Sequence, residues 1–293
     1  MENLYMIQDI APMQLHLEYS QKQPQENDSV FVFRGNTKRE DRALVLMDSN
    51  GQPQIPTYKE LKEAGWITEN TPVQFLFAID DKDYFLLNNG GKDDISLPGY
   101  EYTAIRTFCD KTVTPGLPLA GMTAYHLFFW YRDNTCCGRC GHKMVPFQTE
   151  RAVICPECHN LVFPKLMPAV IIGVRNGNKL LCSRYAGREY KGIALLAGFC
   201  EIGESLEQTV AREVLEEFNC KVSNITYFGS QPWGVDSNLL AGFFCDLDDD
   251  DSITIDENEL ASAGWIDRAD LEPMPNVMSL TATMIEAFRK GEA

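Results

Sequence analysis

Four cysteines near the middle of the chain form two pairs with a regular spacing. Cys137 and Cys140 make the first CxxC pair, and Cys155 and Cys158 make the second, with fourteen residues between the pairs. Four thiolates spaced in this way can converge tetrahedrally on one zinc ion and leave no open coordination position. Such an ion stabilises a segment that is too small to bury its own core. The sequence therefore predicts a structural zinc ribbon over residues 135–165, with catalysis located elsewhere.

Two details of this metal site have alternatives. Cys136 adjoins the set, but Cys137 has the standard two-residue spacing to Cys140, so Cys137 is the expected ligand. His142 and His159 lie beside the outer ligands and are expected to form hydrogen bonds or to face solvent. The alternative to a zinc site is that the four cysteines form two unrelated pairs of buried thiols.

The net charge of the chain limits the partners that it can attract. Forty-two acidic and 26 basic side chains give a net charge of −16, so no global field draws in polyanions. Nucleic acid would have to be met by a local basic patch. Around the predicted ribbon the basic residues are scattered: Arg139, Lys143, Arg151 and Lys165. An architectural role for the ribbon is therefore favoured over nucleic-acid binding.

The chain is long enough for several parts. With 293 residues, of which 44% are hydrophobic, roughly two domains with buried cores are expected. Short β-rich runs and one short helix over 58–64 predict a small N-terminal α+β domain over residues 1–118. The apolar stretch after it predicts a connecting helix over residues 119–134, whose aromatic segment 125–131 forms either core or an interface. Residues 166–293 alternate strand-like and helical stretches and form the last predicted domain.

No segment is expected to enter a membrane or to direct secretion. The first residues carry early acidic side chains and no basic-then-apolar tract. The longest apolar run, Leu166 to Val174, is about half of the roughly 20 residues that a membrane-spanning helix needs. A cytoplasmic location is therefore expected.

The stretch from Gly198 to Cys220 combines a predicted amphipathic helix with clustered carboxylates. Ser205 is a suitable N-cap, and apolar side chains recur every fourth residue after it: Leu206, Val210, Val214 and Phe218. At about 100° per residue, three glutamates share an arc of roughly 100° on this helix: Glu213, Glu216 and Glu217. Like charges at this spacing repel each other, so the cluster favours a bound cation or a compensating arginine. Hard oxygen ligands suit Mg²⁺ or Mn²⁺, which can bridge substrate phosphates.

This stretch resembles the Nudix box, GX5EX7REUXEEXGU with U aliphatic, at every defining position except two. Asn219 stands in place of the last glycine, and Cys220 replaces the final aliphatic residue. Asn readily adopts the left-handed conformation that ends a helix, so this departure is expected to be harmless. The resemblance implies a C-terminal α/β/α sandwich with a mixed sheet.

The resemblance also implies a chemistry for the site. A Nudix enzyme hydrolyses a nucleoside diphosphate linked to another moiety, and three glutamates bind its divalent Mg²⁺ or Mn²⁺: Glu213, Glu216 and Glu217. Arg212 is implied to orient the site through Glu204. The expected general base is Glu217 or Glu216, with Glu259 as a rival or as a further metal ligand.

A zinc ribbon followed by a Nudix box, with a further N-terminal domain, is similar to the NADH pyrophosphatase family. Members of that family carry SQPWPFPxS, and this chain carries Ser230, Gln231, Pro232 and Trp233, followed by Gly-Val-Asp-Ser-Asn over 234–238. Only the first half of the motif is intact. The resemblance implies hydrolysis of NAD(H) to AMP and nicotinamide mononucleotide, removal of NAD caps from RNA, and a homodimer.

Several substrate contacts are implied by position in the same family. Phe163 and Phe199 stand where aromatic rings sandwich the adenine, and Thr281 stands where the family supplies backbone contacts. Ordinary packing is the alternative for these aromatic rings and for Trp233. The altered second half of the motif leaves room for a related substrate such as ADP-ribose or a dinucleoside polyphosphate. A non-catalytic nucleotide-binding regulator is a further alternative, although the intact box glutamates argue against it.

Overall fold

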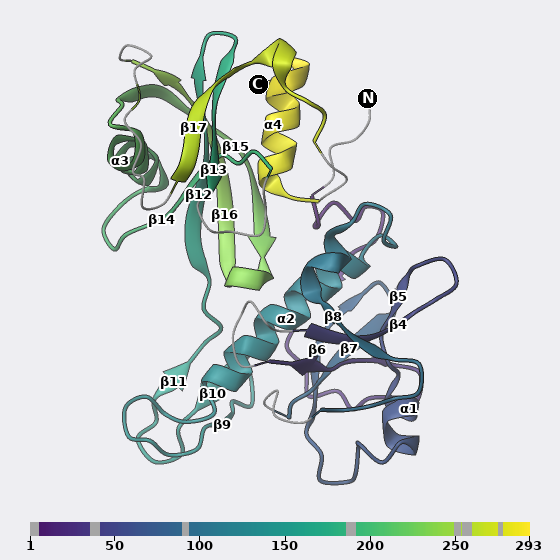
Figure 1. Ribbon diagram of the computed structural model, residues 1–293. Helices are drawn as coiled ribbons and strands as arrows, with labels where there is room; N and C mark the ends of the chain where they lie inside the picture. The colour runs from purple at the N-terminus through teal and green to yellow at the C-terminus, as the bar shows by residue number, and fades with distance from the viewer. Residues whose placement is uncertain are drawn as a thin grey trace. The chain divides into compact units, whose positions relative to one another are not determined.

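The computed structural model describes residues 6–35, 42–89, 94–185, 192–248, 253, 260–274 and 278–293 (Figure 1). Two compact units make up the chain. The first unit comprises Gln8–Lys165 together with Gly234–Ser237, and the second comprises Met1–Ile7, Leu166–Trp233 and Asn238–Ala293. Among the described helices, none has the length and apolar character needed to cross a membrane.

The first unit opens with two small sheets. One has the strand order β1-β6-β7-β2, formed by Leu15–His16, Val73–Ile79, Lys82–Leu87 and Ser29–Phe31. The other has the order β3-β4-β5, with β8 also paired to β4, formed by Phe33–Arg34, Arg42–Met47, Pro53–Gln54 and Glu101–Ala104. The short helix α1 (Tyr58–Glu63) begins at a capping box made by Thr57 and Glu60. A single 3₁₀ turn, η1 (Ile105–Cys109), leads on to the next helix. The predicted N-terminal α+β arrangement is confirmed.

Helix α2 (Leu117–Asp133) supplies the aromatic core of the first unit. Its side chains Tyr125, Phe128 and Phe129 are almost completely buried. The Phe33 ring lies 5.5 Å from the Tyr125 ring and 5.2 Å from the Phe128 ring, centroid to centroid. Edge-to-face and tilted contacts at these distances are favourable aromatic geometry. The aromatic segment therefore forms core.

The cysteine-rich segment folds into three very short strands in the order β11-β10-β9, formed by Leu161–Val162, Val153–Ile154 and Val145–Pro146. Hydrogen bonds tie this ribbon to the rest of the first unit. The Tyr19 hydroxyl donates to the Phe147 carbonyl over 2.9 Å, and the Arg151 guanidinium donates to the Leu76 and Leu17 carbonyls. Burial lowers the pKa of Arg151. The Arg151 guanidinium is therefore used inside the unit, which agrees with the absence of a concentrated basic patch in the sequence around the ribbon.

The second unit is built on a six-stranded sheet with the order β15-β16-β12-β13-β17, to which β14 adds on β12. Its strands are β12 (Met167–Asn176), β13 (Lys179–Tyr185), β14 (Leu196–Phe199), β15 (Val222–Trp233), β16 (Asn238–Leu247) and β17 (Leu260–Asp267). Strands β12 and β16 run parallel, and the other pairs run antiparallel. The predicted mixed sheet is confirmed.

Helices α3 (Leu206–Phe218) and α4 (Leu280–Lys290) cover opposite faces of this sheet (Figure 1). Alternate residues of β12 face the two helices, as the two-residue period of a strand requires. Val170 and Ile172 belong to the core under α3, whereas Ile171 belongs to the core under α4. The 3₁₀ turns η2 (Gly234–Asp236) and η3 (Arg268–Asp270) complete the described elements. The predicted α/β/α sandwich is confirmed.

Candidate active site

Helix α3 is bounded at both ends by residues suited to those positions. The Ser205 hydroxyl accepts from the Gln208 backbone N–H, and the Gln208 side chain accepts from the Ser205 backbone N–H, which completes a capping box. At the other end Asn219 adopts the left-handed conformation, with φ 54° and ψ 35°. The expectation that Asn219 can stand in place of the motif's glycine is confirmed.

The apolar stripe of α3 fixes the direction in which its carboxylates point. Val210, Val214 and Phe218 are buried in the core beneath the helix. On the other side, 13% of the Glu213 side chain and 58% of the Glu216 side chain is exposed. Glu217 lies between these faces and is buried. The helix therefore presents one exposed carboxylate, Glu216, and two that are largely covered, Glu213 and Glu217.

Arg212 connects most of these carboxylates. Its Nε and Nη2 atoms donate to the two oxygens of Glu204 over 2.7 and 3.0 Å. Its Nη1 atom donates to Glu213 over 2.8 Å and to Glu216 over 2.9 Å. The fork with Arg212 holds the pKa of Glu204 down to about 2, with smaller contributions from Glu201 and Thr209. Glu204 contributes most to raising the pKa of Arg212, and Glu213 and Glu216 contribute less. One guanidinium thus orients three carboxylates at once.

Strand β14 passes very close to this carboxylate cluster. A Cβ atom added to Gly198 would lie 1.9 Å from the carboxyl carbon of Glu213. That distance is far below van der Waals contact, so Glu213 keeps its observed position beside this strand only while residue 198 is glycine. The steric requirement explains why the motif starts with glycine at this position.

Substituting Gly198 by alanine is therefore expected to displace the Glu213 carboxylate and to destabilise the chain by ~1–3 kcal/mol, the usual cost of overpacking. Calorimetric Mn²⁺ titration and thermal unfolding measure the two effects. Gly264→Ala is the matched control, because Gly264 lies in strand β17 and a Cβ atom there would meet nothing within 4 Å. Equal behaviour of the two variants would contradict the steric argument.

The four predicted zinc ligands converge in the first unit. Within the part of the chain that the structure describes, they are the one group of three or more ligand-bearing side chains whose ligand atoms all lie within 4.8 Å of each other: Cys137, Cys140, Cys155 and Cys158. Sulfur–sulfur distances are 3.4 Å from Cys140 to both Cys155 and Cys158. Cys136 is exposed and outside the group, so the structure favours Cys137. The cluster fits a structural zinc ion.

The protonation of these thiols also favours a cation. The pKa of Cys137 falls to about 6, mainly because the Arg139 backbone N–H donates to its sulfur. The His142 backbone N–H acts to lower the pKa of Cys140. The nearby sulfurs and burial outweigh it and raise this pKa to about 12, with Cys158 contributing most, and Cys155 and Cys137 less. Thiols this close cannot all ionise unless a positive charge compensates them. A metal ion removes this conflict and holds all four as thiolates.

The three glutamates of α3 do not form so compact a group among the described residues. Glu213 and Glu216 instead turn towards the same nitrogen of Arg212. Their chemistry fits a hard divalent cation, because carboxylate oxygens are the ligands preferred by Mg²⁺ and Mn²⁺. Glu259, the fourth expected acidic residue, lies outside the described residues.

The other predicted site residues occupy varied positions. Phe199 at the end of β14 and Phe163 after β11 are both about half exposed. Gln231 is completely buried, and its side-chain carbonyl accepts from the Leu280 backbone N–H over 2.8 Å, at the start of α4. Two residues are partly buried, Ser230 and Trp233, and Thr281 is partly exposed in the first turn of α4. The link between Gln231 and α4 joins residues 49 positions apart and has no local sequence signal.

Known proteins are similar to part of this chain. The NUDIX domain family matches residues 165–288. A protein of Shigella dysenteriae named NAD-capped RNA hydrolase NudC is 38% identical over 183 residues, which cover 61% of this chain and 70% of that protein. The chain belongs to the Nudix family. A protein of the same name from Erwinia tasmaniensis is 41% identical over 158 residues, and there the chain spans 60% of the relative's length.

The segment that departs from SQPWPFPxS is packed within the first unit. A Cβ atom at Gly234 would lie 2.0 Å from the backbone oxygen of Met122 in α2, so no proline fits on this path. Val235 is buried beside it. Asp236 faces Arg106 at 3.8 Å. In this Nudix chain the altered residues therefore serve packing of the first unit.

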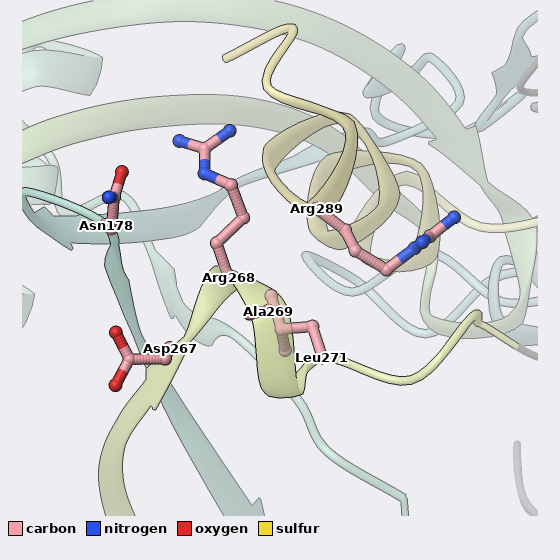
Figure 2. Close-up of a pocket in the computed structure, with 6 residues that line it drawn as sticks. All are labelled: Asn178, Asp267, Arg268, Ala269, Leu271 and Arg289. Atoms are coloured by element: carbon pink, nitrogen blue, oxygen red, sulfur yellow. The ribbon is translucent and has the colours of Figure 1, made fainter.

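A pocket of about 410 Å³ is lined by six residues outside the Nudix box: Asn178, Asp267, Arg268, Ala269, Leu271 and Arg289 (Figure 2). Its two guanidiniums are both engaged. Arg268 donates to the Phe288 carbonyl, and Arg289 bonds to Glu286 over 2.9 Å. None of the predicted site residues lines this pocket. We therefore do not assign the catalytic site to it.

Proposed function

We propose that this chain hydrolyses the pyrophosphate bond of NAD(H), giving AMP and nicotinamide mononucleotide, and that it also removes NAD caps from RNA. The observation that carries the proposal is the carboxylate face of α3, where Arg212 holds Glu213 and Glu216 beside the buried Glu217. The intact SQPW segment and the relatives named NAD-capped RNA hydrolase support this choice of substrate.

The proposed mechanism assigns a role to each residue of the α3 face. Three carboxylates would hold Mg²⁺ or Mn²⁺: Glu213, Glu216 and Glu217, with Glu259 as a further ligand. A bound cation would neutralise charge on the pyrophosphate and would supply Lewis-acid activation of the attacking water. Glu217 or Glu216 accepts the proton of the water that attacks phosphorus. Arg212, fixed by Glu204, keeps the carboxylates oriented through the reaction.

Substrate contacts follow the same proposal. Phe163 and Phe199 are each proposed as adenine-stacking residues, and four further residues are proposed as substrate contacts: Ser230, Gln231, Trp233 and Thr281. We propose these parts for the chain: an N-terminal domain over 1–118, a connecting helix over 119–134, a ribbon with one zinc ion over 135–165, and a Nudix domain over 166–293. A cytoplasmic homodimer completes the proposal. Light scattering on the purified protein tests the dimer.

Product analysis tests the substrate. Purified protein is incubated with NADH, NAD⁺, ADP-ribose, diadenosine polyphosphates or NAD-capped RNA, each with Mg²⁺ or Mn²⁺. AMP and the mononucleotide are the expected products of NAD(H), and a 5′-monophosphate RNA is the expected product of the capped RNA.

Cleavage of ADP-ribose or a diadenosine polyphosphate without cleavage of NAD(H) would reject the proposed substrate in favour of a related Nudix specificity. That second candidate is favoured by the use of Gly234 and Val235 for packing. No cleavage at all would favour a binding regulator.

A further inference from the structure

A buried hydroxyl lies behind the carboxylate cluster of α3. Thr209 is completely buried, although it stands in the first half of an otherwise amphipathic helix. Its Oγ1 lies 2.9 Å from Oε2 of Glu204 and 3.1 Å from the Ser205 carbonyl. A hydroxyl has one proton to donate, and a charged carboxylate is the stronger of these two acceptors. The hydroxyl therefore points its proton at Glu204.

Glu204 is surrounded by donors on both of its oxygens. Arg212 donates to each oxygen in a bidentate fork. The Glu201 backbone N–H donates to Oε2 over 3.2 Å, beside the Thr209 hydroxyl. The backbone contact and the buried hydroxyl hold the Oε2 atom and so restrict the plane of the Glu204 carboxylate independently of the arginine. Because the guanidinium is rigid and planar, that plane sets the direction of its third nitrogen.

The third nitrogen is the one that reaches the proposed metal ligands. Nη1 of Arg212 donates to both Glu213 and Glu216. A chain of short hydrogen bonds thus runs from Thr209 through Glu204 and Arg212 to two carboxylates. If Glu204 turned, the guanidinium of Arg212 would turn with it, and Glu213 and Glu216 would lose the donor that holds them both.

We propose that Thr209 is a positioning residue for the divalent-cation site, which acts by holding Glu204 so that Arg212 keeps Glu213 and Glu216 in place. The proposal rests on the proposed function, because it assumes that these carboxylates bind a cation. The position of Thr209 is a variable one in the Nudix box, so the motif itself does not assign it a role.

Thr209→Val tests the proposal, because valine keeps the shape of the side chain and removes the hydroxyl. Mn²⁺ binding to the zinc-loaded full-length protein is measured by titration calorimetry, beside thermal unfolding of each variant. Loss of one net hydrogen bond that positions the ligands is expected to weaken Mn²⁺ binding by about 3–10-fold. Thr209→Ser keeps the hydroxyl and should bind Mn²⁺ within about twofold of the unmodified chain. Should the valine variant fail to fold, Thr209→Ala carries the same test.

Thr283→Val is the matched control. Thr283 is also buried near the start of a helix, and its Oγ1 donates to the carbonyl four residues earlier, Ser279, over 2.9 Å. The Thr209 hydroxyl also lies near the carbonyl four residues earlier, so the carboxylate acceptor is what distinguishes Thr209 from Thr283. Unchanged Mn²⁺ affinity in Thr209→Val, an equal loss in Thr283→Val, or no rescue by serine would each overturn the proposal. Absence of Mn²⁺ binding by the unmodified chain would overturn it too. Normal Mn²⁺ binding without NAD(H) cleavage would reject only the proposed substrate.

Discussion

Replacing Glu217 by glutamine is expected to abolish hydrolysis while the fold stays intact. Glutamine has nearly the same size, but it cannot accept a proton and is a poor ligand for Mg²⁺. Because Glu217 is buried on the carboxylate face of α3, water cannot take over its position. Loss of a general base alone lowers the rate about 10²–10⁴-fold, and loss of a metal ligand adds to it. The measurement is kcat/KM for NADH at saturating Mg²⁺.

The fold of the Glu217→Gln variant is expected to be preserved. Glu217 follows Glu213 by one helical turn, and removing one of two like charges relieves their repulsion. The Tm should therefore change by less than about 4 °C, which corresponds to ~1 kcal/mol in a domain of this size. Glu207→Gln is the matched control, since Glu207 is an exposed glutamate in the first turn of the same helix. It should keep full activity.

Retention of more than about a tenth of the activity in Glu217→Gln would contradict a role as base or metal ligand. In that case Glu216→Gln becomes the decisive variant, because Glu216 is the other expected base. Activity that survives both substitutions would show that the box carboxylates are not the catalytic centre, and it would return the nucleotide-binding regulator to consideration.

Local patterns made much of the second unit predictable. The four-residue apolar repeat and the N-cap Ser205 predict α3 to within a residue, because a helix must bury one stripe and satisfy its first N–H groups. Asn219 could be placed in the left-handed conformation from its side chain alone. The zinc cluster was predictable as well, since its spacing encodes two knuckles.

Contacts between distant residues were not predictable in the same way. Arg151 donates to a carbonyl 75 positions earlier in the chain, and no local pattern indicates this contact. Gly198 belongs to a sequence motif, but the reason why glycine is needed there is the close approach of Glu213 from α3, which only the structure shows. The burial of Thr209 depends on the neighbours that cover this side of α3. Each of these facts follows from tertiary packing, which leaves no periodic trace in one sequence.

Loss of zinc is expected to have the second large effect, through folding of the first unit. The ribbon strands have two residues each, and few ribbon side chains are buried. Such a segment cannot stabilise itself. A structural zinc ion contributes about 10–16 kcal/mol in isolated zinc-finger peptides, which matches or exceeds the ~5–15 kcal/mol stability of a whole domain. Cys155→Ser should therefore lose its zinc and lower the Tm of the chain by about 10 °C or more.

Cys136→Ser is the matched control for this prediction. Cys136 adjoins Cys137, is exposed and lies outside the sulfur cluster, so its loss should leave one zinc ion and the Tm unchanged. Zinc is counted with a colorimetric chelator after denaturation, and unfolding is followed by circular dichroism. Loss of zinc should also destabilise the rest of the first unit. A ribbon without zinc no longer holds the Phe147 carbonyl and the Arg151 guanidinium where they bond to Tyr19 and to the Leu76 carbonyl. Loss of zinc from Cys136→Ser with retention in Cys137→Ser would reverse the ligand assignment. Unchanged stability of zinc-free Cys155→Ser would show that the ribbon is held by those hydrogen bonds alone.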